Sequence, residues 1–546
     1  MKKLFSILFT LLLVATASAK KDKSTDDNQS FNAMKHIEVY NTVLRELEIN
    51  YVDSLKHDKL LKQSLDRMLY SLDPYTTYIP ASDEETLKRL RSGQYGGIGS
   101  IITLVDGKPY LSEPYYGMPA QVNGLRAGDE IVEIDGVKCE GKSISDVSDM
   151  LRGKPHTEIT IKIRRHGETK IIKKAFLRDI IQMPTVPFYA QVADGVGYIV
   201  LLDFIDRTAA DFEKALKELV AQHNINKLII DLRSNGGGLV GQAVEIASLF
   251  LPRNTEIVSM KGRHNGTSTV YKTHREPLYP NMKLLFLVDG NTASSSEILS
   301  GAMQDLDRAY IFGERTFGKG LVQNVRELPY NNYLKVTTAK YYLPSGRCVQ
   351  AIDYANRQNG STRIIPDSLT KEFRTIKGRI VRDGGGVTPD STITEEATYN
   401  ISGYLYIKNL YFKYANHYVA THPTIAPANQ FQLTDEEYND FCNFVVQSGF
   451  TYRLESEKYL QDLKKMVKTE GYDIKTDSLF VQLTNLLQPN VAEDLNLFRS
   501  DIQEMLEMEI VKRYYYQKGT IEYSLRHDKW LKIAIDIIQN NTDKIQ

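Results

Sequence analysis

The sequence predicts an α/β core domain, preceded by a helical region and a small β-rich module and followed by a mainly helical domain. Three observations predict this fold class. Apolar runs of strand length alternate with helical segments between residues 179 and 395. Short strands separated by Asp-Gly turns fill residues 91–178. Helical periodicity and many tyrosines dominate residues 396–546.

The composition argues against several classes of protein. Of the 546 residues, 42% are hydrophobic and 25% are charged, which is ordinary for a soluble globular chain. The chain has 68 basic residues (Lys and Arg) and 68 acidic residues (Asp and Glu), so its formal net charge is zero. A neutral chain lacks the excess of positive charge that binding to nucleic acid requires, which argues against such a partner. The three cysteines are far apart and no Cys/His metal spacing occurs. We therefore expect no disulfide framework, no metal and no cofactor.

The first residues have the pattern of an export signal. A basic start, MKK, precedes the apolar run LFSILFTLLLVA and the small residues ASA. Residues 1–19 therefore predict a secretory signal peptide, with an uncleaved anchor as the alternative. The polar residues 20–30 predict a disordered linker. We expect an exported protein, periplasmic or otherwise extracytoplasmic, without a transmembrane helix in the mature chain.

Two regions precede the core. Residues 31–90 show helical periodicity and are predicted to form an N-terminal helical region. Residues 91–178 predict a β-rich module, with hairpin turns at Asp106 and Asp135, each followed by glycine. Within this module, SISDVSDMLRG predicts a short amphipathic helix.

The core is expected to alternate strands and helices, with His264 and His274 in a polar connecting loop. Continuous apolar strands followed by helices indicate a sheet that is buried on both faces. The expected strands are VGYIVLLDF, KLIIDLRS, KLLFLVDG, YIFGERTF, GLVQNVREL and YLKVTTAKYYLP, and the expected helices are TAADFEKALKELVAQ, LVGQAVEIASLFL and SEILSGAMQDL.

A glycine triplet follows one of the buried strands. In IIDLRSNGGGLVGQAV, Asn235 precedes Gly236, Gly237 and Gly238, and a helix follows. Consecutive glycines permit positive φ angles and expose backbone N–H groups. At the carboxyl end of a strand and beside a helix N-terminus, such groups are well placed to bind an anion. A tight turn without a ligand is the alternative.

Three serines begin the helix after the next strand. Helix capping explains one of Ser294, Ser295 and Ser296. The functional interpretation is a nucleophile at a strand–turn–helix corner, where backbone N–H groups stabilise an oxyanion. A serine nucleophile needs a base, and none of the ten histidines lies in these junctions. The remaining candidate base is Lys319.

Lys319 lies in GERTFGKGLVQ, which also has the spacing of a phosphate-binding P-loop. In a P-loop the lysine is followed by Ser or Thr and then by a helix, but here Gly320 and a strand-like segment follow. Export would also remove the chain from the cytosolic nucleotide pool. We therefore expect a general base, kept neutral by the apolar neighbours Phe317, Leu321 and Val322. A nucleotide-dependent enzyme is the alternative.

The motifs LRSNGGG, NTASSSEILSGAMQD and GERTFGKGLVQ together resemble those of the carboxyl-terminal processing peptidases, or tail-specific proteases. YYLPSGR and GGGVTPD are similar to later parts of this family, and the resemblance covers about residues 40–395. It implies a crotonase/Clp-protease-like fold for a serine protease core at residues 179–395. It also implies a PDZ domain inserted before that core, and chemistry without a metal or organic cofactor.

The resemblance also implies the roles of five residues. Ser294 corresponds to the nucleophile, Lys319 to the general base and Gln323 to the residue that orients the lysine. The backbone N–H groups of Gly238 and Ser295 correspond to the oxyanion hole. The family usually has alanine after the nucleophile, where this chain has serine.

That departure leaves a second candidate nucleophile open. The extra hydroxyl group next to Ser294 leaves the backbone donor intact, but it complicates the assignment among three consecutive serines. Ser296 is the alternative nucleophile.

The segments YGGIGSIITL and AQVNGLRAGDEIVEIDGV resemble a PDZ domain. The resemblance implies that the loop of Gly97, Ile98 and Gly99 binds the terminal carboxylate of a substrate through backbone N–H groups. The substrate tail would then add as a β-strand beside the strand that follows. The alternative is that the glycines only lead into that strand.

Together these features predict an extracytoplasmic serine endopeptidase that recognises C-terminal tails of protein substrates and processes or degrades them. The alternative is a non-catalytic PDZ-containing peptide-binding protein on the same core. Residues 396–546 fit the resemblance poorly. They are expected to be a helical packing domain, and capping of the active site, self-association and binding of an adaptor remain open for them.

Overall fold

In this computed structural model of the protein, the residues described are 32, 34–83, 94–182, 184–263, 268–358, 361–393 and 400–540. The expected signal peptide and linker, residues 1–30, lie outside the described residues. The chain divides into two compact units, Met1–Pro80 and Ala81–Gln546. In the first unit, residues 34–50 are helical, and helix α2 (His57–Tyr70) and strand β1 (Thr77–Ile79) follow.

The β-rich module begins and ends in paired strands. β2 (Gln94–Gly97) pairs antiparallel with β9 (Asp179–Gln182), so the chain enters and leaves the module at one place. Between them, one sheet has the order β3-β4-β5-β7-β8, and β3 lies at its edge. The bounds are β3 (Ser100–Val105), β4 (Lys108–Pro114), β5 (Glu130–Ile134), β6 (Val137–Lys138), β7 (Glu158–Arg164), β8 (Ile172–Leu177), α4 (Pro119–Val122) and α5 (Ile144–Leu151).

The turns of this module follow from its Asp-Gly pairs. Asp106 and Asp135 have φ values of 51° and 47°, and the glycines that follow them have 75° and 84°. Positive φ at both central residues is the geometry that lets a two-residue turn join twisted strands. The predicted hairpins are confirmed on this basis.

The core domain is built on a sheet of order β10-β11-β12-β15-β16-β23. From β11 onward the strands run parallel, and β10 pairs antiparallel at the edge. The bounds are β10 (Phe188–Ala193), β11 (Val196–Val200), β12 (Lys227–Asp231), β15 (Lys283–Val288), β16 (Tyr310–Gly313) and β23 (Ser391–Thr392).

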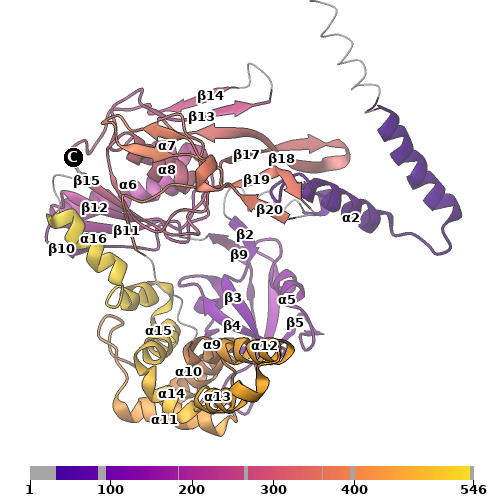
Figure 1. Ribbon diagram of the computed structural model, residues 1–546, viewed down its shortest axis with the longest axis vertical. Helices are drawn as coiled ribbons and strands as arrows, with labels where there is room; N and C mark the ends of the chain where they lie inside the picture. The colour runs from indigo at the N-terminus through magenta and orange to yellow at the C-terminus, as the bar shows by residue number, and fades with distance from the viewer. Residues whose placement is uncertain are drawn as a thin grey trace, which may run out of the picture. The chain divides into compact units, whose positions relative to one another are not determined.

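Both faces of this sheet are covered, and by different parts of the chain (Figure 1). Leu228 and Ile230 of β12 pack into the cluster that contains α6 (Thr208–His223), α7 (Val240–Ala247) and α8 (Ser295–Asp305). Ile229, between them, packs instead with Trp530 and Leu531 of α16 (Lys529–Asn540). Successive residues of a strand face opposite sides, so continuous apolar strands require cover on both faces.

A second sheet joins β13 (Glu256–Gly262), β14 (Thr269–Lys272), β17 (Leu321–Leu328) and β18 (Asn332–Tyr342). The expectation of a connecting loop around His274 is wrong in part, because β13 and β14 form a hairpin just before it. β14 is only four residues long, and its one apolar aliphatic residue, Val270, is exposed, so it shows no alternation of buried apolar and exposed polar residues. His264 lies outside the described residues. Smaller pairs are β19 (Ile352–Gln358) with β20 (Ser361–Ile364), and β21 (Glu372–Arg374) with β22 (Ile380–Arg382).

The C-terminal domain is helical, as predicted. α11 (Asp435–Gln447) begins with the predicted capping box, in which Thr434 and Glu437 bond each other's backbone N–H groups. Most of the other helices share one core with α11: α9 (Ile401–Ile407), α10 (Leu410–Thr421), α14 (Val491–Leu497) and α15 (Arg499–Ser524). Within the described residues, no helix combines the length and apolar character that crossing a membrane requires.

This helical domain also contacts the β-rich module. Lys413 of α10 lies 2.8 Å from Asp106, and the ring of Phe412 packs edge-on against Tyr110 of β4. From α15, the hydroxyl of Tyr516 accepts a hydrogen bond from Gln121. The β-rich module is therefore held by helices that follow the core in sequence.

Candidate active site

Ser294 lies at the turn between β15 and α8. Its backbone has φ 58° and ψ −118°, a conformation that a non-glycine residue rarely adopts and that costs energy. The turn is held from both sides, because Asp289 accepts the N–H of Thr292 at 2.9 Å and the Thr292 hydroxyl donates to the Leu232 carbonyl at 2.9 Å. The strained corner is thus anchored to the neighbouring strand.

The three consecutive serines differ in their surroundings. The Ser295 hydroxyl donates to the carbonyl of Gly238 at 2.8 Å, and the Ser296 hydroxyl donates to the carbonyl of Asn235 at 3.0 Å. Both side chains are fully buried, whereas Ser294 is half-buried. Ser295 and Ser296 therefore tie α8 to the glycine loop, and Ser294 is the one of the three serines that is not fully buried.

The glycine loop packs directly against this corner. A Cβ on Gly237 would lie 2.7 Å from the Ser295 nitrogen, and one on Gly238 would lie 2.2 Å from the Phe204 carbonyl oxygen. Gly237 and Gly238 have φ values of 93° and 146°. Glycine is needed here both for the backbone conformation and for the close approach.

The predicted oxyanion donors lie on these two adjacent segments. The Gly237 N–H donates to the Asn235 side chain at 2.9 Å. Among the hydrogen bonds of the described residues, none has the backbone N–H of Gly238 or Ser295 as its donor. Unpaired N–H groups on neighbouring segments are what stabilisation of an oxyanion requires.

The lysine loop bends as the glycines around it predict. Gly318 has φ 83°, and a Cβ there would lie 2.3 Å from the Cβ of Ala351. The Gly320 N–H donates to the Gln350 side chain at 2.8 Å. Strand β17 begins at Leu321, so a helix N-terminus of the P-loop type is absent at this place.

The apolar neighbours of Lys319 in the chain differ in their exposure. Leu321 is buried and Val322 is half-buried, but Phe317 is 42% exposed. That these neighbours keep Lys319 neutral stays a prediction. The Phe317 N–H is bound to the Thr292 carbonyl at 3.0 Å, and the backbone reverses at Gly318 directly afterwards. Lys319 itself is half-buried.

Glu297 joins the serine corner to the lysine loop, a role that reading the motifs missed. One carboxylate oxygen accepts the backbone N–H of Ser294 at 2.8 Å and that of Lys319 at 2.9 Å. The other accepts the Gly318 N–H at 2.8 Å and the Thr316 hydroxyl at 2.6 Å. Because one oxygen binds both N–H groups, the backbone nitrogens of the two proposed catalytic residues, Ser294 and Lys319, lie close together.

The environment of Glu297 has opposing effects on its charge. The side chain is fully buried, and burial raises the pKa of this carboxyl, while the hydrogen bonds from Thr316 and three backbone N–H groups act to lower it. A sequence signal for the residue was present, since Ser294 and Glu297 have the S-x-x-E spacing of a capping box.

Gln323 and Tyr341 complete the surroundings of the two loops. Gln323 lies on β17 at a β-bulge, and its amide nitrogen donates to the Thr337 hydroxyl at 3.2 Å on β18. The hydroxyl of Tyr341, also on β18, donates to the Ser294 carbonyl at 3.2 Å. Strand β18 is therefore hydrogen-bonded both to the turn at Ser294 and to β17, the strand that follows Lys319.

The carboxylate-loop residues lie in the β-rich module, apart from this cluster in the fold. Ile98 is buried in the module core, and its carbonyl accepts the Ala120 N–H at 2.8 Å. Gly99 has φ 71°, and a Cβ there would lie 2.5 Å from Met118. The following strand, β3, is an edge strand with α5 beside it. The edge strand leaves backbone N–H and C=O groups to which a peptide can add as a further strand.

Arg233 connects the glycine loop to the C-terminal helix. Its guanidinium lies 2.5 Å from Asp231 and 2.6 Å from Asp528, and it stacks over the ring of Trp530. Asp528 also accepts the Leu531 N–H at the start of α16. The segment that leads into Asn235 is therefore held by a residue almost 300 positions later in the chain.

The described residues include no group of three or more His, Cys, Asp or Glu side chains arranged to hold a metal ion. The three cysteines are unpaired; Cys139 is buried, and Cys348 and Cys442 are half-buried.

Comparisons with known proteins agree with this architecture. Residues 195–360 match the model of peptidase family S41, residues 110–165 match a PDZ domain, and residues 401–538 match the model described as "Probable PDZ-protease, C-terminal helical domain". Residues 396–546 were expected to fit the family poorly. The match of residues 401–538 to the C-terminal helical domain of PDZ-proteases corrects that expectation.

Individual relatives are similar over most of their length. A carboxy-terminal-processing protease of Bartonella bacilliformis is 33% identical over 333 residues, which are 60% of this chain and 76% of the relative. A probable CtpA-like serine protease of Staphylococcus aureus is 29% identical over 68% of this chain and 78% of its own. The solved photosystem II D1 C-terminal processing protease is 28% identical over 64% of this chain and 86% of its own, with a TM-score of 0.37.

The fold and the site define a serine protease with an α/β core and a PDZ domain. The chain belongs to peptidase family S41 and is a carboxy-terminal processing protease.

Proposed function

We propose that the protease acts through a Ser/Lys dyad, with Ser294 as nucleophile and Lys319 as general base. The observation that carries this proposal is the Glu297 carboxylate, which binds the backbones of both residues with one oxygen. A second argument is that the hydroxyls of Ser295 and Ser296 are already engaged with backbone carbonyls.

The chemistry follows from this arrangement. Neutral Lys319 accepts the Ser294 hydroxyl proton as the serine oxygen attacks the scissile carbonyl carbon. The N–H groups of Gly238 and Ser295 bind the oxyanion, and Lys319 returns the proton to the leaving amine as the C–N bond breaks. Lys319 then takes a proton from water, whose oxygen attacks the acyl-enzyme ester. Lys319 returns this proton to the Ser294 oxygen as the ester C–O bond breaks and the new carboxyl terminus is released. Gln323 helps to orient the lysine through its place on β17.

Recognition of C-terminal tails is assigned to the PDZ domain. The tail pairs with the open edge of β3, and its terminal carboxylate binds backbone N–H groups of the loop formed by Gly97, Ile98 and Gly99. The substrates are proteins with exposed C-terminal tails. The signal-like start of the chain supports export, so cleavage takes place outside the cytoplasm.

Substitution of the nucleophile tests the dyad. Ser294→Ala is expected to lower the cleavage of an unfolded protein by about three orders of magnitude or more, since the covalent step is lost. Ser295→Ala is the matched control, because it removes a neighbouring hydroxyl and keeps the backbone donor. It loses one hydrogen bond to the Gly238 carbonyl, so it is expected to lose no more than about tenfold in activity. Full cleavage by Ser294→Ala would disprove the dyad and favour a different nucleophile. Tail binding without cleavage by the wild-type chain would favour the non-catalytic alternative.

A further inference from the structure

The two glycines beside Lys319 give the lysine loop little stiffness of its own. Gly318 and Gly320 have no Cβ, so their backbone angles are restricted less than those of any other residue. The direction in which the Lys319 side chain leaves the backbone is set by the two peptide planes that meet at its Cα. A general base at this place therefore needs groups outside the loop to fix both planes.

Glu297 fixes the first of these planes. Its carboxylate accepts the N–H of Lys319 at 2.9 Å and the N–H of Gly318 at 2.8 Å. The Lys319 N–H belongs to the peptide group that joins residues 318 and 319, so its direction sets that plane. The plane on the other side of the Lys319 Cα carries the N–H of Gly320, and a different side chain binds that group.

Gln350 binds the second plane. Its side-chain oxygen accepts the Gly320 N–H at 2.8 Å, and its side-chain nitrogen donates to the Ile352 carbonyl at 2.8 Å. The two bonds use opposite ends of the amide, so together they fix its orientation. The side chain is only 7% exposed, so water does not replace a partner that is lost here.

The contact between Gln350 and the lysine loop requires glycine at position 320. A Cβ on Gly320 would lie 2.8 Å from the backbone nitrogen of Gln350 and 2.9 Å from its Cβ. The backbone adds a bond at the same place, since the Ala351 N–H donates to the Gly318 carbonyl at 2.9 Å. Gln350 and its neighbour therefore lie directly against the loop.

The motif GGGVTPD holds the segment that carries Gln350. The Gly386 N–H donates to the carbonyl of Val349 at 2.9 Å, directly before Gln350. Gly386 has φ 75°, and a Cβ there would lie 2.4 Å from the Thr316 carbonyl oxygen. The Val387 N–H donates to the Thr316 hydroxyl at 2.7 Å. The motif thus binds both the segment before Gln350 and the start of the lysine loop.

We propose that Gln350 is a positioning residue for the general base. Together with Glu297 it fixes the two peptide planes at Lys319, and so the direction of the lysine side chain. This inference rests on the proposed role of Lys319 as the base. Loss of the Gln350 amide displaces the base but leaves the groups that bind the substrate unchanged, so it slows the chemical step rather than weakening binding.

Gln350→Met tests this role, because methionine keeps the length of the side chain and removes its amide. Cleavage of fluorescently labelled casein, an unfolded protein, is expected to show kcat reduced about tenfold or more and KM changed by less than about threefold. An unchanged kcat, or a loss that appears in KM alone, would overturn the proposal.

Gln242→Met is the matched control in the core domain. The side-chain oxygen of Gln242 also accepts a backbone N–H at 2.8 Å, that of Ala209 in α6. This variant is expected to lose thermal stability as Gln350→Met does, but to keep kcat within about twofold of the wild type. If kcat instead falls in both variants in proportion to the loss of melting temperature, Gln350 has a purely structural role and the proposal is wrong.

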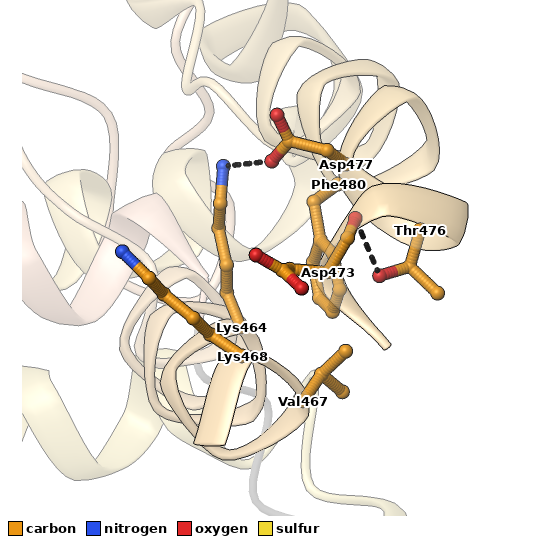
Figure 2. Close-up of a pocket in the computed structure, with 7 residues that line it drawn as sticks. All are labelled: Lys464, Val467, Lys468, Asp473, Thr476, Asp477 and Phe480. Carbon is orange, nitrogen blue, oxygen red and sulfur yellow. Dashed lines mark hydrogen bonds and ion pairs between the residues drawn. The ribbon is translucent and has the colours of Figure 1, made fainter. Parts of the chain in front are cut away.

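A surface ion pair provides a second control. Helix α12 (Glu455–Thr469) and helix α13 (Asp473–Leu486) of the C-terminal domain line a shared hollow, in which Lys464 lies 2.9 Å from Asp477 (Figure 2). Asp477→Asn removes this exposed ion pair, and such pairs contribute little to stability. Its kcat and KM are expected to equal those of the wild type. A loss of kcat as large as that of Gln350→Met would show that the effect is not specific to the lysine loop and would overturn the proposal.

Hydrogen exchange followed by mass spectrometry gives a readout that does not depend on activity. In the wild type, a peptide that spans Gly318–Gly320 is expected to exchange slowly, because all three N–H groups are bound by buried side chains. Gln350→Met is expected to speed this exchange about tenfold or more, and Gln242→Met to leave it unchanged. Rapid exchange of the loop in the wild type, or equal rates in the wild type and Gln350→Met, would overturn the proposal.

Lys319→Arg, assayed beside these variants, separates a failure of this inference from a failure of the proposed function. If Lys319→Arg is inactive while Gln350→Met keeps the wild-type kcat, only the positioning role is wrong. Normal cleavage by Lys319→Arg would disprove the general base, and this inference with it.

Discussion

The carboxylate of Glu297 holds the backbone N–H of Lys319 at 2.9 Å, through the same oxygen that binds the N–H of Ser294. The spacing between the two proposed catalytic residues therefore depends on one buried side chain. Glu297→Gln replaces an acceptor by an amide that can turn only one oxygen toward four donors. We expect kcat to fall by about ten- to a hundredfold with a smaller change in KM. The reason is that displacing Ser294 from Lys319 slows the chemical step, whereas the residues that bind the substrate are unchanged. An unchanged kcat would show that Glu297 does not position the dyad.

The same variant has a predicted pH signature. Burial raises the pKa of Glu297 in the folded protein above its unfolded value, so the folded state binds more protons between these two values. The stability contributed by this group is present at low pH and is lost as pH rises through the folded pKa. Glu297→Gln lacks this proton, so the wild type's advantage in melting temperature should shrink as pH rises. A constant difference would contradict the raised pKa.

Lys319 is predicted to act only when neutral. Lys319→Arg keeps a positive charge at the site, but a guanidinium does not give up its proton, so we expect a loss of about three orders of magnitude in kcat/KM. Lys335→Arg is the control, because burial lowers the pKa of Lys335 and this lysine lies on β18, outside the lysine loop. Comparable activity in both variants would exclude Lys319 as the base.

The carboxylate loop predicts a preference for free C-termini. In the Ser294→Ala chain, which binds without cleaving, a peptide with a free terminal carboxylate should bind about tenfold or more tightly than the same peptide with a terminal amide. The reason is that hydrogen bonds from backbone N–H groups to a charged acceptor are worth more than those to a neutral one. Fluorescence anisotropy with labelled peptides measures this ratio. Equal affinities of the two peptides would mean that the terminal carboxylate does not contribute to binding.

The contact between Arg233 and Asp528 predicts that the C-terminal helix influences catalysis. Asp528→Asn weakens one of the two carboxylate partners of the half-buried Arg233 guanidinium next to the glycine loop. We expect kcat to fall about tenfold, with KM nearly unchanged, because the loop that carries Gly238 loses support. Asp536→Asn is the matched control, because Asp536 is exposed on α16, the helix that begins directly after Asp528. A loss of thermal stability with normal kcat would assign Asp528 a purely structural role.

Parts of this molecule were predictable because they depend on local chemistry. The Asp-Gly turns, the Thr434 capping box and the continuous apolar strands all express local rules of backbone conformation and burial. Strand β14 escaped prediction because it has only four residues and its apolar Val270 is exposed, so no buried apolar alternation marks it. The exposure of Phe317 also escaped it, because the direction of a side chain next to a positive-φ glycine depends on what the loop packs against.

Residues close together in the chain specify the elements of the protease: the glycine triplet, the serine corner, the lysine loop and the PDZ pattern. How these elements contact one another follows from the tertiary structure. It distinguishes Ser294 from Ser295 and Ser296 by hydrogen bonds to residues 57 and 61 positions away. It brings the Lys319 backbone to Glu297 and the C-terminal Asp528 to Arg233. These contacts join distant segments, and their geometry follows from how helices and sheets pack, which local sequence rules do not specify.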